Sequence, residues 1–122
     1  MYNVNGLDFE RRPMNKLIET EKRLASAISN AKSLDDGGKL TEEPAREAWT
    51  EVSQIYLELV EMTPLDSDKG IAARREAVMA ACKAMDGDLA INIFTNLVSG
   101  GNITPELAYE LRNILWPKAD SR

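Results

Sequence analysis

The sequence predicts an all-α fold, a single-domain bundle of about five helices in which two longer helices precede three shorter ones. Apolar residues recur at spacings of three and four along most of the chain, as on the buried face of a helix. Helix stop and start signals interrupt this pattern, most clearly in two similar segments, Gly37-Gly38-Lys39-Leu40-Thr41 and Gly100-Gly101-Asn102-Ile103-Thr104. One short apolar run, residues 89–98, also suits a buried strand, but no second strand is available to pair with it. All five elements are therefore expected to be helices.

Residues 1–10 are expected to form an extended N-terminal arm. Tyr2 and Val4, and after Gly6 also Leu7 and Phe9, alternate with polar residues, and this period of two favours extended backbone. The arm packs on its own bundle in the first interpretation and docks on a neighbouring subunit in the second. The helical bundle domain then spans residues 11–117, and residues 118–122 form a loose C-terminal tail.

The two long helices have the clearest patterns. The first is predicted from about Pro13 to Leu34, because proline suits a first helical turn. Its inward seam comprises Met14, Leu17, Glu21, Leu24, Ile28 and Ala31. The second is predicted from a Thr41 cap to Thr63, which precedes a proline. Its apolar face is so wide that we expect it to be the central helix with more than one neighbour.

Three shorter helices follow. One begins among Asp66, Ser67 and Asp68, which are competing caps, and runs to about Met85. Gly70 should weaken its start locally, and its expected inward residues are Ile71, Val78, Cys82 and Met85. The turn Asp86-Gly87-Asp88 leads into the next helix, and the last begins at Thr104-Pro105 and ends at Trp116-Pro117. Leu40 and Ile103 are each predicted to be a buried anchor beneath the turn that contains them.

Composition places this chain among soluble globular proteins. Its 122 residues are 43% hydrophobic and 29% charged, which suits one packed core. No apolar run approaches the roughly 20 residues of a membrane-spanning helix, and the N-terminus lacks a signal-peptide pattern. Cys82 is the only cysteine, which agrees with a reducing cytoplasm. We therefore expect a cytoplasmic protein that does not bind membranes.

The residue types argue against catalysis, cofactors and metals. Histidine is absent, so the most common general base and a principal zinc ligand are missing. Cys82 falls on an apolar stripe and is expected to be a small core residue. A calcium loop that starts at Ser33 would place Pro44 where the bidentate glutamate belongs. The pairs Asp66/Asp68 and Asp86/Asp88 lie at helix starts, where aspartate commonly caps the helix, so they are not expected to bind a metal ion. The chain is predicted not to be an enzyme.

Charge is unevenly distributed, and this asymmetry identifies candidate partner-binding residues. Residues 10–34 contain six basic and three acidic side chains, whereas residues 41–62 contain six acidic side chains and one basic side chain. Five polar side chains share one stripe of the second helix. Such a stripe is either a solvated face or a docking surface for a basic partner. Together with two adjacent arginines and two aromatic residues near the N-terminus, the candidate set is Glu47, Glu51, Gln54, Glu58, Glu61, Arg11, Arg12, Tyr2 and Phe9.

These observations favour a small non-enzymatic protein-interaction module, such as an adaptor, a secretion chaperone or an inhibitor of another protein. The alternative is a structural or assembly subunit that forms a homo-oligomer through residues 1–10 or the helix Leu107–Trp116. Nucleic-acid binding ranks lower, because the net charge is −5 and Glu106 and Glu110 would face the phosphates in a helix-turn-helix at residues 98–115. The size, acidity and helical hairpins are similar to those of many bacterial chaperones and phage accessory proteins.

Overall fold

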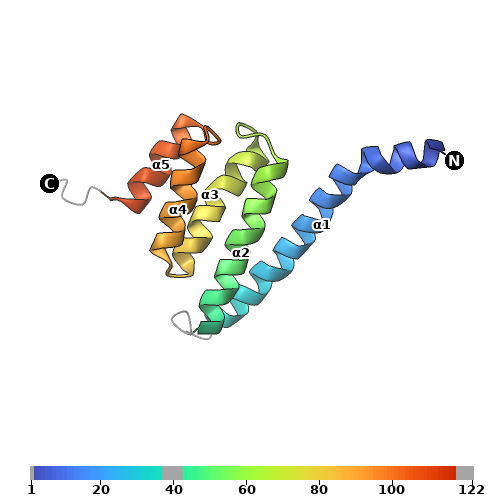
Figure 1. Cartoon of the computed structure of the whole chain (residues 1–122). Coiled ribbons are helices and arrows are strands. Elements are labelled where there is room, and N and C mark those ends of the chain that lie inside the picture. The colour runs from blue at the N-terminus through green and yellow to red at the C-terminus, as the bar shows by residue number, and fades with distance from the viewer. Residues whose placement is uncertain (1, 37–42, 118–122) are drawn as a thin grey trace.

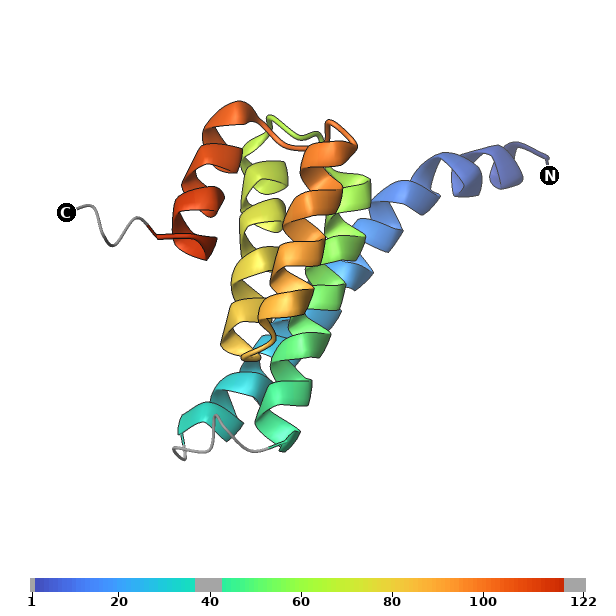
Figure 2. The ribbon, with the colours of Figure 1, turned by 60° about the vertical axis from the view of Figure 1, so that its left-hand side comes forward.

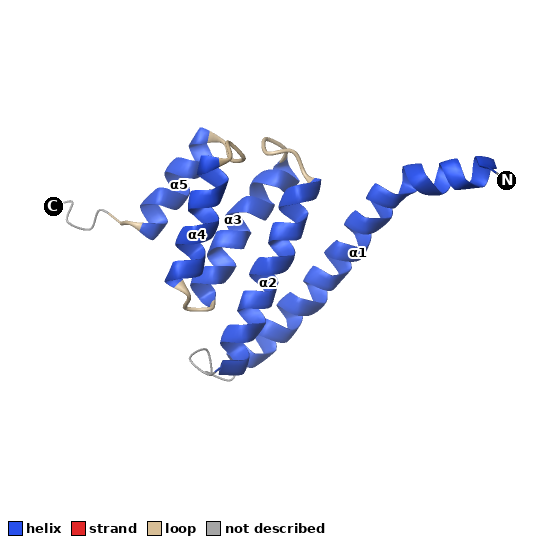
Figure 3. Ribbon diagram, in the orientation of Figure 1, coloured by secondary structure: helices blue, strands red, loops and turns tan. Residues whose placement is uncertain are grey.

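Helices form every regular element of the part of the chain that the structure describes. The computed structural model describes the backbone of residues 2–36 and 43–117, and the side chains of residues 15–35 and 43–117. Its helices are α1 (Tyr2–Asp36), α2 (Glu43–Met62), α3 (Asp68–Lys83), α4 (Gly87–Ser99) and α5 (Pro105–Leu115). Figure 3 shows no strand among these residues. The all-α class and the number of helices are therefore confirmed.

The two long helices pack as an antiparallel hairpin, and Figure 1 shows α1 running back along α2 from the end where they are joined. The predicted seam holds where side chains are described. Ala31 is fully buried, and Leu17, Glu21, Leu24 and Ile28 are each partly buried. Met14 lies outside the described side chains. The first glycine segment, with Gly37, Leu40 and Thr41, lies outside the described residues altogether.

The extended conformation predicted for residues 1–10 is wrong for residues 2–10, because they form the first turns of α1. The apolar residues that alternate there also fit a helix, since Tyr2 and Phe9 are seven residues apart and Val4 and Leu7 three. A helix pairs its backbone groups internally, whereas an extended segment needs a neighbouring strand. Pro13 consequently lies inside α1. The helix changes direction in its N-terminal part, where a proline removes one backbone donor (Figure 1).

Helix α2 is central, as its wide apolar face predicts. It packs against α1 on one side and α3 on the other, and Figure 1 shows α2 between these two helices. The fully buried Ser53 hydroxyl donates a hydrogen bond of 2.7 Å to the Ala77 carbonyl of α3. Trp49 and Val52 are buried toward α1 and α3 in a small cluster that includes Ala31 and Ala80. The α2 face therefore holds two neighbours at once.

Local signals fix the starts of the three shorter helices. Ser67, rather than Asp66 or Asp68, caps α3, and its hydroxyl accepts a 2.9 Å bond from the Gly70 amide. The Asp86 carboxylate accepts a 3.0 Å bond from the Leu89 amide at the start of α4. The Thr104 hydroxyl accepts a 3.2 Å bond from the Leu107 amide at the start of α5. These three side chains satisfy amides that have no partner within their helices.

The corners after α3 and after α4 share one C-terminal geometry. After α4, the Gly101 and Asn102 amides donate to the Val98 and Leu97 carbonyls, and Gly101 has a φ of 65°. Gly101, the second glycine of this segment, thus occupies the left-handed position that commonly ends a helix. Ile103, next along this corner, is partly buried against the main core, so its predicted role as an anchor agrees with its position.

Met85 closes the corner after α3, and its predicted inward orientation is wrong. The Met85 and Asp86 amides donate to the Cys82 and Ala81 carbonyls, and Met85 has a φ of 60°. The helix ends before this residue, so its side chain leaves the inward stripe and is 54% exposed. Of the other expected inward residues, Val78 is fully buried, whereas Ile71 and Cys82 are partly buried.

Replacing Met85 with glycine is expected to stabilise the protein. The left-handed conformation costs a residue with a Cβ atom roughly 1 kcal/mol or more, part of which is offset because glycine gains entropy in the unfolded chain. We expect the free energy of unfolding to rise by up to about 1 kcal/mol, measured by urea denaturation. A loss of stability would show that the exposed Met85 side chain makes a contact that matters more than its backbone conformation.

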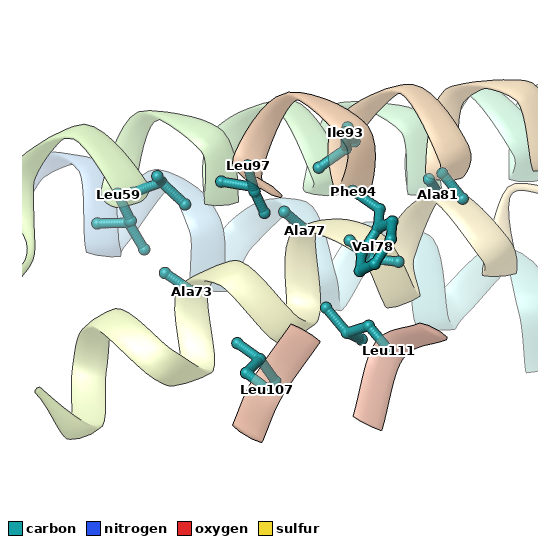
Figure 4. Close-up of a cluster of buried hydrophobic side chains, with 12 residues drawn as sticks. Leu59, Ala73, Ala77, Val78, Ala81, Ile93, Phe94, Leu97, Leu107 and Leu111 are labelled. Carbon is teal, nitrogen blue, oxygen red and sulfur yellow. The ribbon is translucent and has the colours of Figure 1, made fainter. Parts of the chain in front are cut away.

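The main core lies where α2, α3, α4 and α5 meet. Alanines on α3, among them Ala73, Ala77 and Ala81, allow neighbouring helices to approach closely (Figure 4). Leu107 and Leu111 of α5 point toward this helix, and both are buried. The core therefore holds α5 by two leucines, and the opposite face of α5 remains uncovered.

Candidate interaction surfaces

The predicted acidic stripe is a real feature of the α2 surface. Glu47, Glu51, Gln54 and Glu61 are exposed, and the partly buried Glu58 lies among them. The stripe is not purely acidic, because Arg23 of α1 donates hydrogen bonds of 2.8 and 3.2 Å to the two Glu58 carboxylate oxygens. These bonds lower the pKa of Glu58 and keep it ionised. Its role in binding a basic partner stays a prediction.

The other predicted partner-binding residues lie at the N-terminus. Tyr2, Phe9, Arg11 and Arg12 belong to α1, and their side chains lie outside the described set. In both Figure 1 and Figure 2, the N-terminal part of α1 extends away from the other helices. The backbone therefore presents these positions beyond the bundle, and their binding role stays a prediction.

A groove between α4 and α5 brings together three of the exposed large apolar side chains of the described residues. Tyr109 is 68% exposed, Trp116 48% and Val98 46%, although large apolar side chains are usually buried. They surround a groove of about 360 Å³, whose remaining lining residues are Phe94, Pro105, Ala108 and Arg112. The rings of Phe94 and Trp116 meet edge to face, with centroids 5.8 Å apart. We call this surface the α4–α5 groove.

Arg112 gives this groove its only charged side chain. Among the described residues it forms no ion pair within 4.0 Å, whereas Arg75 and Glu110, on the other side of α5, bind each other through bonds of 2.7 and 2.9 Å. The groove thus combines tyrosine, tryptophan and arginine, the three residue types most enriched among energetically dominant interface residues. The sequence predicted the helix Leu107–Trp116 only as a self-association surface, and no residue of the groove was among the candidate partner-binding residues. The exposure of Tyr109 could have been predicted, because it lies off the inward stripe that Leu107 and Leu111 define on this helix.

A buried arginine, also missed by sequence reasoning, joins three segments. Arg74 of α3 is 2% exposed and donates six hydrogen bonds. Nε and Nη2 donate to the main-chain carbonyl and side-chain Oδ1 of Asn102 at 2.8 and 2.7 Å. Nη2 also reaches the Val60 and Thr63 carbonyls at the end of α2, at 3.3 and 3.2 Å. The remaining bonds go to the Gly70 carbonyl and the Thr63 hydroxyl.

The surroundings of Arg74 indicate a structural role. Its acceptors are mostly carbonyl oxygens, including those at the C-terminus of α2, where the helix dipole favours a cation. Burial lowers the pKa of Arg74, and the nearby Glu61 opposes this effect. The guanidinium nevertheless remains charged, because its ordinary pKa is so high. The burial of Arg74 could have been predicted from its spacing. It lies three residues after Ile71 and four before Val78, which places it on the inward stripe of α3.

Cys82 is half-buried, as its apolar stripe predicts, and burial raises the pKa of its thiol. We expect the thiol to react with Ellman's reagent at pH 8 at least about tenfold more slowly in the folded protein than in urea, because the thiolate is the reactive form. Since the pKa is higher in the folded than in the unfolded state, stability should fall as pH rises above about 8.5. Equal rates in both states would show that Cys82 is open to solvent and reactive.

The described residues contain no group of three or more Cys, Asp or Glu side chains placed to hold a metal ion. Within the same part of the chain, no helix has both the length and the apolar content needed to cross a membrane. Comparison with known protein families, curated proteins and solved structures finds no match to this chain. The candidate surfaces therefore have to be judged on their own chemistry.

Proposed function

We propose that this chain is a non-enzymatic protein-interaction module that binds another protein through the α4–α5 groove. The observation that carries the proposal is the exposure of Val98, Tyr109 and Trp116 around one groove. Contiguous exposed apolar surface of this kind marks interaction sites, because leaving it in water is unfavourable. An adaptor, a secretion chaperone or an inhibitor would each use such a surface. The cytoplasm is the proposed location, since a free Cys82 suits a reducing compartment.

The lining defines the chemistry of the partner segment. Phe94, Val98 and Trp116 favour an apolar or aromatic side chain in the groove, and the Tyr109 ring offers a flat contact surface at its edge. Arg112 favours a carboxylate at a neighbouring position of the partner, because guanidinium binds carboxylate oxygens in pairs. We therefore propose a partner segment that carries one large apolar residue and one acidic residue.

The test begins with a partner captured on the immobilised full chain and continues with titration calorimetry on the purified pair. Trp116→Ala is expected to raise the Kd by at least about 30-fold, since truncating a dominant interface residue costs about 2 kcal/mol or more. Arg112→Gln should weaken binding less and should reduce its salt dependence. Each variant is first checked for an unchanged urea midpoint.

Glu47→Gln combined with Glu51→Gln serves as the matched control on the exposed stripe of α2. This variant should leave the Kd unchanged if the groove is the binding surface. The proposal would be overturned if Trp116→Ala and Tyr109→Ala bound with wild-type affinity. If the α2 control lost binding instead, the acidic stripe would be the docking surface for a basic partner.

Self-association is the second candidate, and the same exposed aromatic residues favour it. The helix Leu107–Trp116 would then be covered by another copy of the chain, since a two-fold dimer buries the same surface patch on both copies. Light scattering at several concentrations distinguishes the two. A homo-oligomer that dissociates in the Trp116→Ala variant supports the assembly function, whereas a monomer at all concentrations rejects it.

A further inference from the structure

A second pocket lies between α1 and α3, with α2 as its floor. Its volume is about 150 Å³, and its lining comes from all three helices. Ile28 of α1 and Val52 of α2 supply apolar contacts, and Ala80 of α3 leaves room because its side chain is short. Cavities of about 150 Å³ accommodate a ring the size of benzene. The space therefore suits one small aromatic group.

The indole of Trp49 is the one buried polar group among the lining residues that has no hydrogen-bond partner in the described part of the chain. Trp49 is 4% exposed, and its Nε1 donor has no hydrogen-bond partner among the described residues. A buried donor without an acceptor is unfavourable by an amount comparable to a lost hydrogen bond. Trp49, which lines the pocket, thus carries a buried donor without an acceptor.

The charged residues of the pocket add a preference for an anion. Lys83 of α3 places its ammonium 4.6 Å from the centre of the Trp49 ring, and Lys32 of α1 also lines the pocket. Neither lysine forms an ion pair within 4.0 Å among the described residues. Glu76 is the one acidic residue of the lining, so the pocket has a net positive charge although the whole chain has a net charge of −5.

Tyr56 supplies one further polar group at the pocket. Burial, followed by the negative charge of Glu76, raises the pKa of the Tyr56 hydroxyl. The phenol therefore remains protonated at neutral pH and is available to donate a hydrogen bond. Two lysines, one glutamate and Tyr56 thus line a space whose remaining lining residues, Trp49 among them, are largely apolar.

We propose that this pocket binds a small aromatic carboxylate. The ring lies against Ile28, Val52 and the Trp49 indole, and the carboxylate binds the ammonium groups of Lys32 and Lys83. This binding site is separate from the α4–α5 groove and does not depend on the proposed function.

Benzoate is the probe for the test, and the full chain labelled with ¹⁵N is the sample. The two indole signals in the amide–proton NMR spectrum are assigned with the Trp116→Phe variant. Benzoate should shift the Trp49 indole signal in a saturable manner, and benzamide, which keeps the ring but lacks the charge, should bind at least about tenfold more weakly. Acetate, which lacks the ring, should also bind more weakly.

Variants of Lys32 and Lys83 test whether these ammonium groups attract the carboxylate of benzoate. Lys32→Gln combined with Lys83→Gln should raise the Kd for benzoate at least about tenfold, and Glu76→Gln should lower it several-fold because a like charge is removed. Lys69→Gln is the control, since Lys69 pairs with Glu21 elsewhere between α1 and α3. Equal affinity for benzoate and benzamide, an unshifted Trp49 signal, or a double-lysine variant that binds as well as wild type would each overturn the proposal.

Discussion

Replacing Arg74 with methionine is expected to lower the free energy of unfolding by about 3–5 kcal/mol, a large part of the stability of a domain this size. Methionine fills a similar volume but donates no hydrogen bond. The Val60 and Gly70 carbonyls would then lose their Arg74 donor in the buried part of the fold, and both Asn102 acceptors would lose theirs where the network is partly buried. Each unsatisfied buried acceptor costs about 1–3 kcal/mol. Urea denaturation followed by circular dichroism measures the change.

Arg74→Lys should recover little of this loss, because a single ammonium cannot reach acceptors on three segments as the planar guanidinium does. The neighbouring Arg75 provides a matched control. Its pair with Glu110 is partly exposed to solvent, so Arg75→Gln should cost less than about 1 kcal/mol. If Arg74→Met cost no more than Arg75→Gln, the buried network would not be a major source of stability.

Replacing Gly70 with alanine is expected to lower the free energy of unfolding by about 2–3 kcal/mol. A Cβ atom at this position would lie 1.7 Å from the Pro64 carbonyl oxygen and 2.9 Å from the Ser67 hydroxyl. The first of these atoms belongs to the backbone, so relief requires moving the turn between α2 and α3. Intrinsic helix propensity predicts the opposite sign, since alanine favours a helix over glycine by roughly 1 kcal/mol.

Gly87 is the control for this substitution. It is the first residue of α4, and a Cβ atom there would meet nothing within 4 Å. Gly87→Ala should therefore be neutral or stabilising by up to about 1 kcal/mol. The two variants are compared by their urea midpoints. A Gly70→Ala protein as stable as Gly87→Ala would mean that the turn adjusts readily and that the close approach of Pro64 is not required.

The sequence predicts those features of the fold that depend on short-range signals. The caps at Asp86 and Thr104 and the boundaries of α4 and α5 follow from a few adjacent residues. Short-range signals do not predict the conformation of Met85, because its left-handed backbone depends on how the chain turns after α3. Gly70 shows the same limit. Its low helix propensity is visible in the sequence, whereas the nearby Pro64 carbonyl that requires it is a tertiary contact.

The candidate surfaces divide in the same way. Glu47 and Glu51 share a face of one helix, so spacing alone places them on a common stripe. The α4–α5 groove is formed by two helices. Predicting it would require knowing which faces of these two helices α3 covers. Tyr109 and Val98 lie outside the buried stripes of their own helices, and only the packing brings them to one groove. The partners of Arg74 come from three segments, so its spacing indicates burial without identifying what it binds.

The order in which the helices pack has a consequence for the folding rate. Among the described helices, backbones come close between successive pairs along the chain, and α3 with α5 is the one additional pair. Contacts between segments near in sequence need little loop-closure entropy before they form, and chains dominated by them fold within microseconds to milliseconds. Arg74, which joins α2, α3 and the corner at Asn102, adds longer-range contacts to this local pattern. Such a chain reaches its folded state rapidly, and the arginine joins the end of α2 to the corner between α4 and α5.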